Sequence, residues 1–215
     1  MSMSVIEKLL SKRKQVRQFS EDKIPNLEDV NRIINKTYDL VASKQSLVPY
    51  KITVLGPHKK EEKQELYDLS IKNDGGHGNE NIFAPYVLCF TNRLVKNPNS
   101  SVKRKIAKGH QYDELNPLVY RKKGLEVGIE VGMFSKILTS LCMENGFDVS
   151  YLLCFSEISE DKNPYSDKKP VLSFLEDRLL FSMQIGYQKS GDVSHKFIKD
   201  FDEYKPDITE IIEWL

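Results

Sequence analysis

The sequence predicts an α+β fold, and three observations lead to this prediction. Segments whose apolar residues recur at helical spacing and short apolar runs typical of strands are both present along the 215 residues. They do not alternate as regular βαβ units, so a doubly wound parallel sheet is not expected. The composition, with 40% hydrophobic and 29% charged residues, is that of an ordinary globular protein. We therefore expect a single domain over residues 1–215 with one sizeable core.

Two helices are predicted before the first strand. Ser4 and Glu7 have the spacing of a capping box, so the first helix should run from about residue 5 to residue 12. The second should begin near Asn26, with acidic residues in its first turn. Its predicted apolar face consists of Val30, Ile33, Ile34, Tyr38 and Val41.

The middle of the chain alternates between apolar and polar segments. Residues 50–55 (YKITVL) are followed by Gly-Pro, which predicts a strand and a turn. Residues 58–73 indicate a charged surface helix, and residues 74–81 a loop. Residues 84–91 (APYVLCFT) are nearly all apolar, which is typical of a buried strand. Residues 92–118 are polar with weak periodicity, so we expect a mobile excursion from the domain there.

The longest helical pattern covers residues 118–146, and an Asn-Gly pair should end this helix. Two further strands are predicted at 147–155 and 178–187. The tail that follows is polar up to residues 208–215 (ITEIIEWL), whose apolar side chains we expect to dock on another surface.

Three glycines recur every four residues in the long helix, at Gly124, Gly128 and Gly132. Each costs up to about 1 kcal/mol of helix propensity relative to alanine. A row of small residues lets a second backbone approach closely, as is best known in membrane helices. The row therefore indicates that another backbone approaches this helix closely.

Bulk properties exclude several classes of function. A formal net charge of +1 argues against broad nucleic-acid binding. No apolar run approaches the ~20 residues of a membrane span, and the N-terminus lacks the apolar core of a signal peptide. Three scattered cysteines in apolar contexts, Cys89, Cys142 and Cys154, are typical of reduced thiols in a cytoplasmic protein. The histidines have no metal-ligand spacing, and we find no acid–base or nucleophile motif.

Cations are concentrated in residues 12–19 (KRKQVRQF), directly after the first predicted helix. Cations at a helix C-terminus interact favourably with the helix dipole, so the segment can be a solvated helix end. Guanidinium groups also match the oxygens of a phosphate, so the segment can equally bind an anion. Taken alone, the segment leaves both interpretations open.

Five motifs, in this order, resemble those of the nitroreductase family of FMN-dependent oxidoreductases. The resemblance rests on KRKQVRQF, VASKQSLVPYKITVL, APYVLCF, ENGFDVSYLLCF and LLFSMQIGYQ. It implies a nitroreductase-like α+β sandwich, with a mostly antiparallel sheet flanked by helices, in an interlocked homodimer. FMN would lie at each of two sites on the interface, and the glycine row would face the partner's helix. The alternative for the glycine row is a tight contact against a strand of the same chain.

The resemblance also implies an activity. NADH or NADPH would reduce FMN, and a nitroaromatic, quinone or similar acceptor would then be reduced in the same cleft by a ping-pong mechanism. No essential catalytic side chain is implied, which fits the missing acid–base motif. The excursion at 92–118 would shape the acceptor site. An alternative is a flavin-binding protein without general reductase activity, such as a cofactor carrier or regulatory module; a further one is an interaction protein without flavin.

The resemblance assigns cofactor contacts to four groups of residues. The phosphate and ribityl chain would be bound by Arg13, Lys14, Gln15 and Arg17. The partner subunit's loop would contribute Ser43, Lys44, Gln45 and Ser46. Contacts with the flavin ring would come from Asn79, Asn81, Tyr151, Leu152, Leu153 and Cys154, with the backbone N–H of Leu153 donating to flavin N5. A final phosphate contact would come from one of Lys189, Lys196 and Lys199, with spacing in favour of Lys199.

Several of these positions depart from the family pattern. Ser46 and Val48 stand where the family often has Asn and Gln, and Leu153 and Cys154 replace Glu and Gly. These replacements motivate the alternative of a flavin protein without general reductase activity. Each position also has a plain structural interpretation as part of a surface turn, a buried strand or a solvated lysine.

Overall fold

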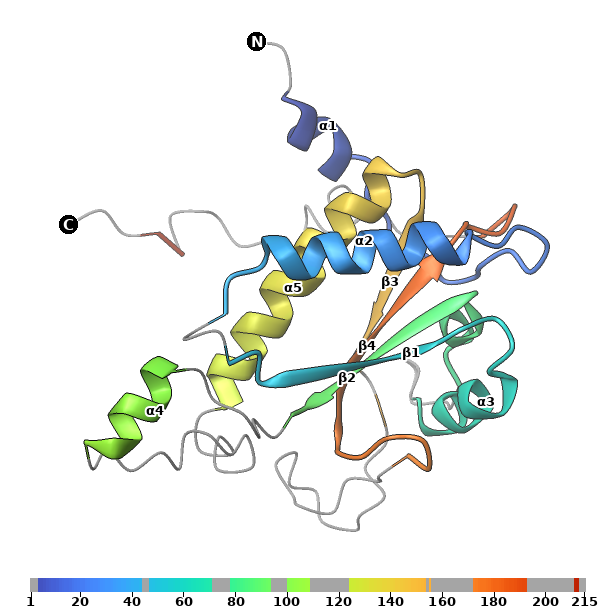
Figure 1. The fold of residues 1–215 in the computed structure, drawn as a ribbon. Coiled ribbons are helices and arrows are strands. Elements are labelled where there is room, and N and C mark those ends of the chain that lie inside the picture. Colours follow the sequence, from blue (N-terminus) through green and yellow to red (C-terminus); the bar gives the residue numbers. More distant parts are fainter. Residues whose placement is uncertain are drawn as a thin grey trace.

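A four-stranded antiparallel sheet forms the centre of the protein in the computed structural model (Figure 1). The structure describes residues 4–43, 47–70, 78–93, 100–108, 124–153, 155, 172–192 and 211–212. The strands are β1 Tyr50–Leu55, β2 Tyr86–Asn92, β3 Asp148–Leu152 and β4 Leu179–Gly186. Their order in the sheet is β1-β2-β4-β3, so β1 and β3 are the edge strands. Each of these strands lies where the sequence predicts one.

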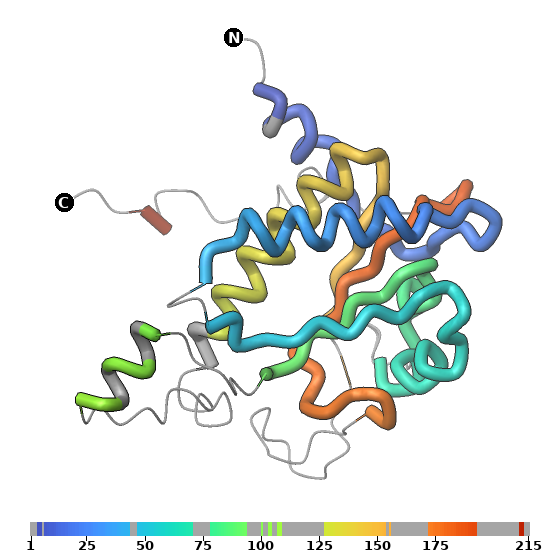
Figure 2. Tube along the Cα trace, viewed as in Figure 1, coloured from blue at the N-terminus to red at the C-terminus, as the bar shows by residue number. Residues whose placement is uncertain are grey.

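The alternation of side chains along the strands divides the core into two layers. On one face, Leu88 of β2 and Met183 of β4 are paired residues with no exposed surface, and Phe90 stacks on Phe181 with ring centroids 4.7 Å apart. Helices α2 (Leu27–Leu40) and α5 (Gly124–Glu144) cover this face. Figure 2 shows these two helices lying across the strands.

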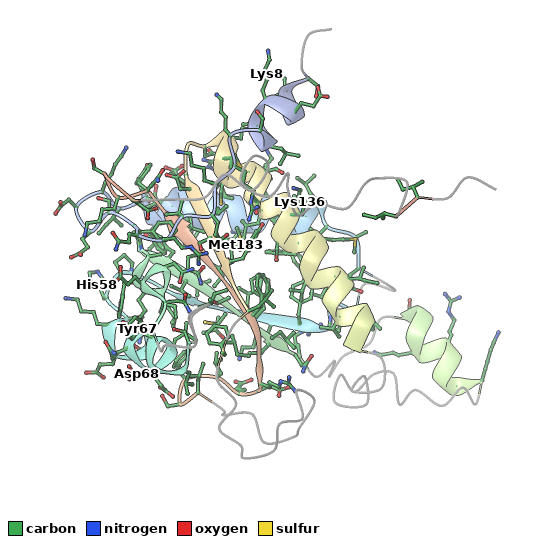
Figure 3. The ribbon with its side chains drawn as sticks, turned by 180° about the vertical axis from the view of Figure 1, so that it is seen from behind. Lys8, His58, Tyr67, Asp68, Lys136 and Met183 are labelled. Atoms are coloured by element: carbon green, nitrogen blue, oxygen red, sulfur yellow. The ribbon has the colours of Figure 1, made fainter. Side chains whose placement is uncertain are left out.

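The opposite face is covered by shorter elements. These are α3 (Lys60–Leu69), the 3-10 helix η2 (Glu80–Phe83), and residues 16–19 and 172–175. Leu66 of α3 and Ile82 of η2 are fully buried against Val87 and Cys89 of β2. In Figure 3, Met183 lies at the centre, between Tyr67 of α3 and Lys136 of α5. The architecture is therefore the predicted α+β sandwich.

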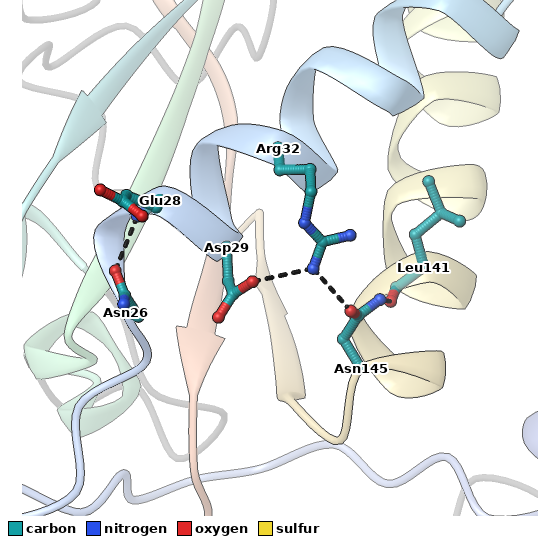
Figure 4. Close-up of polar contacts among 6 residues, drawn as sticks. All are labelled: Asn26, Glu28, Asp29, Arg32, Leu141 and Asn145. Carbon is teal, nitrogen blue, oxygen red and sulfur yellow. Dashed lines mark hydrogen bonds and ion pairs between the residues drawn. The ribbon is translucent and has the colours of Figure 1, made fainter.

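Polar contacts fix α2 against the end of α5 (Figure 4). Asn26 caps α2 by accepting a hydrogen bond from the Glu28 N–H over 2.9 Å. Arg32 donates from Nη2 to Asp29 Oδ1 and to Asn145 Oδ1, both over 2.9 Å. Asn145 also donates to the carbonyl of Leu141, so the end of α5 is tied to α2.

The first two helices follow the prediction with two corrections. The capping box of Ser4 and Glu7 is present, but α1 covers Val5–Leu10 and ends two residues before the predicted end at residue 12. Cations 12–14 therefore follow the helix instead of forming its last turn. Tyr38 is 58% exposed and does not belong to the apolar face of α2. Thr37 is buried in its place, because positions 30, 33 and 37 share one face at 3.6 residues per turn.

Three other segments differ from expectation. The predicted loop at 74–81 runs into η2, so part of it is helical. Helix α4 (Ser100–Ala107) lies within the excursion at 92–118, whose residues 94–99 and 109–118 are outside the described part of the chain. Ile211 and Ile212, expected to dock, are 68% and 44% exposed. The rest of the C-terminal segment lies outside the described residues.

The end of α5 and the two described cysteines are as the sequence predicts. Gly146 has φ 76° and ends α5, with the N–H of Phe147 bonded to the Cys142 carbonyl over 2.9 Å. Cys89 and Cys142 are buried free thiols, whereas Cys154 is outside the described residues. Within the described ranges, no helix is long and apolar enough to span a membrane.

The glycine row of α5 does not contact a strand at its two described members. Gly128 and Gly132 are exposed, and a Cβ at either position would have no described atom within 4 Å. Ile129 and Met133 beside them are 51% and 40% exposed. This arrangement overturns the interpretation of Gly128 and Gly132 as a close contact against one of the described strands. Among the described residues, it leaves an apolar face with two gaps for a second backbone.

Candidate functional site

The basic segment after α1 runs along the open edge of the sheet, beside β3. Gln15 is buried there, and its Nε2 donates to Ser150 Oγ over 2.8 Å and to the Tyr151 carbonyl over 2.7 Å. Further along the segment, Phe19 pairs with Gln188 in an isolated β-bridge. The segment is thus bonded to the core at both ends, which fixes its course along β3.

Arg13 stacks on an aromatic ring of the same strand. Its guanidinium carbon lies 4.8 Å from the centroid of the Tyr151 ring, within the range of a cation–π interaction. The Tyr151 hydroxyl contacts Thr139 Oγ1 and lies 3.3 Å from the Ser135 carbonyl, both on α5. Burial raises the pKa of Tyr151, and the hydrogen bond with Thr139 and the charge of Arg13 oppose this rise.

A second amide reaches the same serine from η2. Asn81 is buried, and its Nδ2 donates to Ser150 Oγ over 2.8 Å. The carbonyl oxygens of the Gln15 and Asn81 side chains are buried, with no hydrogen-bond partner among the described residues. Because buried acceptors are nearly always satisfied in proteins, these two oxygens are candidates to accept a hydrogen bond from a bound ligand or water.

Gln184 of β4 lies opposite Ser150 in the sheet and extends this polar region. Its Nε2 donates to Ser182 Oγ over 2.7 Å, and its side-chain oxygen is a third buried acceptor without a partner in the described part of the chain. Ser150, Ser182 and Gln184 were missed by the sequence analysis. The available signal was polar residues at alternate positions of two otherwise apolar strands.

Lys63, predicted on a charged surface helix, is buried. Its Nζ donates to the carbonyls of Ala84 over 2.7 Å and Pro85 over 3.0 Å, at the end of η2. Burial lowers the pKa of Lys63 to about 8, because desolvation disfavours the ammonium form. The bonds hold α3 to the element that carries Asn81.

The other predicted contacts of the basic segment lie nearby. Lys14 and Arg17 are half-buried, and the Arg17 N–H donates to Asp192 Oδ2 over 3.1 Å. Lys189 joins this region, since its N–H donates to the Gln18 carbonyl over 2.9 Å. Lys196 and Lys199, the alternatives for the last phosphate contact, are outside the described residues.

The other residues predicted to contact the flavin ring differ in their exposure and in their contacts. Leu152 is buried in the core, whereas Leu153, directly after β3, is 71% exposed beside the site. The N–H of Asn79 donates to Ser70 Oγ over 2.6 Å. Cys154 lies outside the described residues.

The predicted partner loop is held by its own contacts. Ser43 Oγ accepts a hydrogen bond from the Val48 N–H over 2.8 Å, and Val48 has a positive φ of 45°. Arg93 donates to the carbonyls of Val48 and Leu47. In Figure 1 this loop follows α2 near the start of α5, whereas the basic segment follows α1 near the other end. Lys44, Gln45 and Ser46 are outside the described residues, so their roles stay predictions.

The arrangement is suited to binding a ligand rather than to acid–base chemistry. It combines a guanidinium, two amides with buried acceptors and an exposed leucine at one edge of the sheet. The described residues contain no group of His, Cys, Asp and Glu that can hold a metal ion.

Comparison with solved structures identifies the fold as that of nitroreductases. An NAD(P)H:FMN oxidoreductase from Staphylococcus epidermidis has a TM-score of 0.65 at 16% identity, covering 100% of this chain and 98% of that one. A nitroreductase from Exiguobacterium sibiricum in complex with FMN has a TM-score of 0.62 at 14% identity, covering 100% and 99%. CLA-ER, an enone reductase of gut-bacterial fatty acid saturation, has a TM-score of 0.63 at 12% identity, covering 100% of each chain.

No sequence-family model and no curated protein matches the chain. The predicted nitroreductase-like sandwich is confirmed at the level of the fold.

Proposed function

We propose that the chain binds FMN at the open edge of β3 and acts as an NAD(P)H-dependent oxidoreductase with nitroaromatic, quinone or similar acceptors, by a ping-pong mechanism. When bound, FMN supplies the hydride chemistry. The observation that carries the proposal is the pair of buried side-chain oxygens of Gln15 and Asn81, which have no hydrogen-bond partner among the described residues. The solved structures described as an NAD(P)H:FMN oxidoreductase and as an FMN complex support the choice of cofactor.

The hydrogen-bonding groups of Gln15, Asn81 and Arg13 fit the chemistry of FMN. The pyrimidine edge of a flavin alternates carbonyl acceptors with an N–H donor, and an amide side chain can pair with such an edge. Gln15 and Asn81 supply two acceptors, and the single ring N–H of the flavin can donate to one of them. Arg13 supplies charge-assisted donors for a phosphate, with Lys14 and Arg17 close to it in sequence. We propose Lys199 or Lys189 for a further phosphate contact.

The end of β3 would run along the flavin ring. Backbone groups of a strand point alternately to its two sides, and the Tyr151 carbonyl points to the open edge, where Gln15 binds it. The N–H of Leu153, two residues later, should point to the same edge. The exposed side chain of Leu153 offers an apolar surface to a flat ring, and no side chain of this chain is required to transfer a proton.

The functional unit in this proposal is a homodimer. The exposed face of α5 with Gly128, Ile129, Gly132 and Met133 supports a helix–helix contact with a second copy. The loop with Ser43–Ser46 would then reach the partner subunit's cofactor. The buried thiols of Cys89 and Cys142 support a cytoplasmic location, and no nucleic-acid or membrane partner is proposed.

The test is to purify the protein and record its visible absorbance before and after anaerobic addition of NADH or NADPH. We expect the absorbance of oxidised flavin and its loss on reduction. A yellow protein that neither nucleotide bleaches would favour the flavin carrier or regulatory module, for which Leu153 in place of an acidic residue is the motivating observation. A protein that neither retains nor binds added FMN would overturn both.

A further inference from the structure

We infer that Tyr151 is a positioning residue for cofactor binding: its ring holds Arg13 where the guanidinium meets the phosphate. This inference rests on the proposed function and goes beyond the resemblance, which assigns Tyr151 only to the strand along the flavin. It concerns a pair of side chains, Arg13 and Tyr151, that are 138 positions apart in the sequence and meet only in the folded chain.

The ring of Tyr151 is itself fixed from behind. Its hydroxyl contacts Thr139 Oγ1 and approaches the Ser135 carbonyl at 3.3 Å, and both residues are buried on α5. Its ring centroid lies 6.0 Å from that of Phe181 in β4. Because α5 and the sheet both hold it, the ring is a rigid surface for the guanidinium.

Stacking is compatible with phosphate binding because the two use different parts of the guanidinium. The Arg13 guanidinium carbon lies over the aromatic ring, 4.8 Å from its centroid, and a guanidinium carries five N–H donors in the plane of the group. A flexible arginine loses rotamer freedom when it binds a ligand, and a residue that already restricts it reduces this cost. The ring should therefore strengthen phosphate binding without touching the ligand.

The same residue fixes the backbone of the basic segment. Its carbonyl accepts a hydrogen bond from Gln15 over 2.7 Å, so Tyr151 contacts two residues of the segment, Arg13 through its ring and Gln15 through its backbone. A side-chain substitution at Tyr151 removes the first contact and leaves the second available. This separation makes the role of the ring testable.

The experiment compares binding of FMN and riboflavin, which lacks the phosphate, to protein freed of flavin. Fluorescence titration gives both dissociation constants for the wild type and for Tyr151→Leu, Tyr151→Phe, Arg13→Ala and the double variant Arg13→Ala/Tyr151→Leu. We expect Tyr151→Leu to weaken FMN about 3- to 30-fold and riboflavin less than about twofold. Tyr151→Phe keeps the ring and should preserve the ratio of the two affinities. Once Arg13 is alanine, loss of the ring should change nothing further.

Tyr187 provides a matched control, because Lys23 Nζ lies 4.0 Å from its ring centroid in a second cation–π pair. Tyr187→Leu should leave the FMN-to-riboflavin ratio unchanged. If Tyr151→Leu does not fold, Tyr151→Met removes the ring with less loss of apolar volume and carries the same expectation. Equal weakening of FMN and riboflavin, or no change in either, would overturn the inference. A wild-type protein that binds neither flavin would overturn the proposed function itself.

Discussion

Gln15 and Asn81 share one hydrogen-bond acceptor: the amide group of each donates to Ser150 Oγ, both over 2.8 Å. One donor comes from the segment after α1 and the other from η2, and the shared hydroxyl lies on the edge strand β3. Three segments therefore meet at a single side-chain oxygen. This serine holds Asn81, and together with the Tyr151 carbonyl it holds Gln15.

Substitution of Ser150 should affect folding and cofactor binding together. Ser150→Ala leaves two buried amide donors without their shared acceptor, so we expect the free energy of unfolding to fall by about 2–4 kcal/mol. FMN affinity should also fall, because Asn81 loses this hydrogen bond and Gln15 keeps only the one to the Tyr151 carbonyl. Urea unfolding and flavin titration measure the two effects. Ser182→Ala is the matched control, since Ser182 accepts from Gln184 in the same polar region. A loss no larger than that of the control would count against the shared-acceptor role.

Removal of the two arginines of the basic segment should release the cofactor. Arg13→Ala with Arg17→Ala removes two charge-assisted donors worth about 1.5–3 kcal/mol each, so FMN binding should weaken roughly 10²- to 10⁴-fold with the fold retained. Flavin content after gel filtration and far-UV circular dichroism measure this. Lys36→Ala with Lys60→Ala removes the same charge from exposed positions of α2 and α3. Unchanged flavin content in the arginine variant would show that the phosphate binds elsewhere.

Leucine at Gly128 should break the proposed dimer without unfolding the subunit. A Cβ at Gly128 meets no described atom within 4 Å, so the added side chain has room in the isolated chain. It would fill the gap needed for close approach of a second helix. Sedimentation velocity should show a dimer for the wild type and a monomer for Gly128→Leu. Lys36→Leu on the exposed side of α2 controls for added apolar surface. A Gly128→Leu dimer with full flavin content would contradict the contact.

Alanine at Gly186 should destabilise the fold. A Cβ at this position of β4 would lie 2.7 Å from Phe19 Cδ1 and 2.7 Å from Pro85 Cδ. The proline ring cannot rotate away, so we expect a loss of about 1–3 kcal/mol in the free energy of unfolding. At Gly56, nothing lies within 4 Å of the added atom, and Gly56→Ala serves as the control. Chemical unfolding of both variants decides the matter, and equal stability would refute the packing argument.

Lys63 should make stability depend on pH in a predictable direction. Burial lowers its pKa from 10.5 to about 8, so between these values the unfolded chain holds a proton that the folded chain has released. The contribution of Lys63 to the free energy of unfolding therefore rises as pH increases from 8 to 10.5. This contribution is lost as pH falls through 8. Lys63→Met lacks this rise. Between about pH 7 and pH 9.5 its free energy of unfolding should therefore increase by about 1–3 kcal/mol less than that of the wild type.

The comparison must be made between the two proteins at each pH. Burial raises the pKa of Tyr50 and of the Cys89 thiol to about 12 each, so both groups favour the folded state less as pH rises through their ordinary values. These contributions are common to wild type and Lys63→Met and cancel in the difference. A difference in unfolding free energy that stays constant over this pH range would show that Lys63 titrates normally.

The sequence by itself determined the elements whose signals are local. The capping box of α1, Asn26 before α2 and the Asn-Gly end of α5 are read from neighbouring residues, because each depends on contacts within one helical turn. The four strands are also predicted from local signals, because each is a short apolar run in the sequence. The basic segment was also visible, but its residues alone did not separate a helix end from an anion site.

The tertiary structure alone decided which polar residues meet. Gln15 and Ser150 are 135 positions apart and Asn81 and Ser150 are 69 apart, so no spacing along the chain indicates that they share a hydrogen bond. The same holds for Lys63, whose helix is rich in charged residues and whose Nζ is bonded to carbonyls at the end of η2. Local patterns report on backbone conformation and on which face is apolar. The partners of a buried polar group are set by the packing of distant segments, because that packing removes it from water and brings its donors and acceptors together.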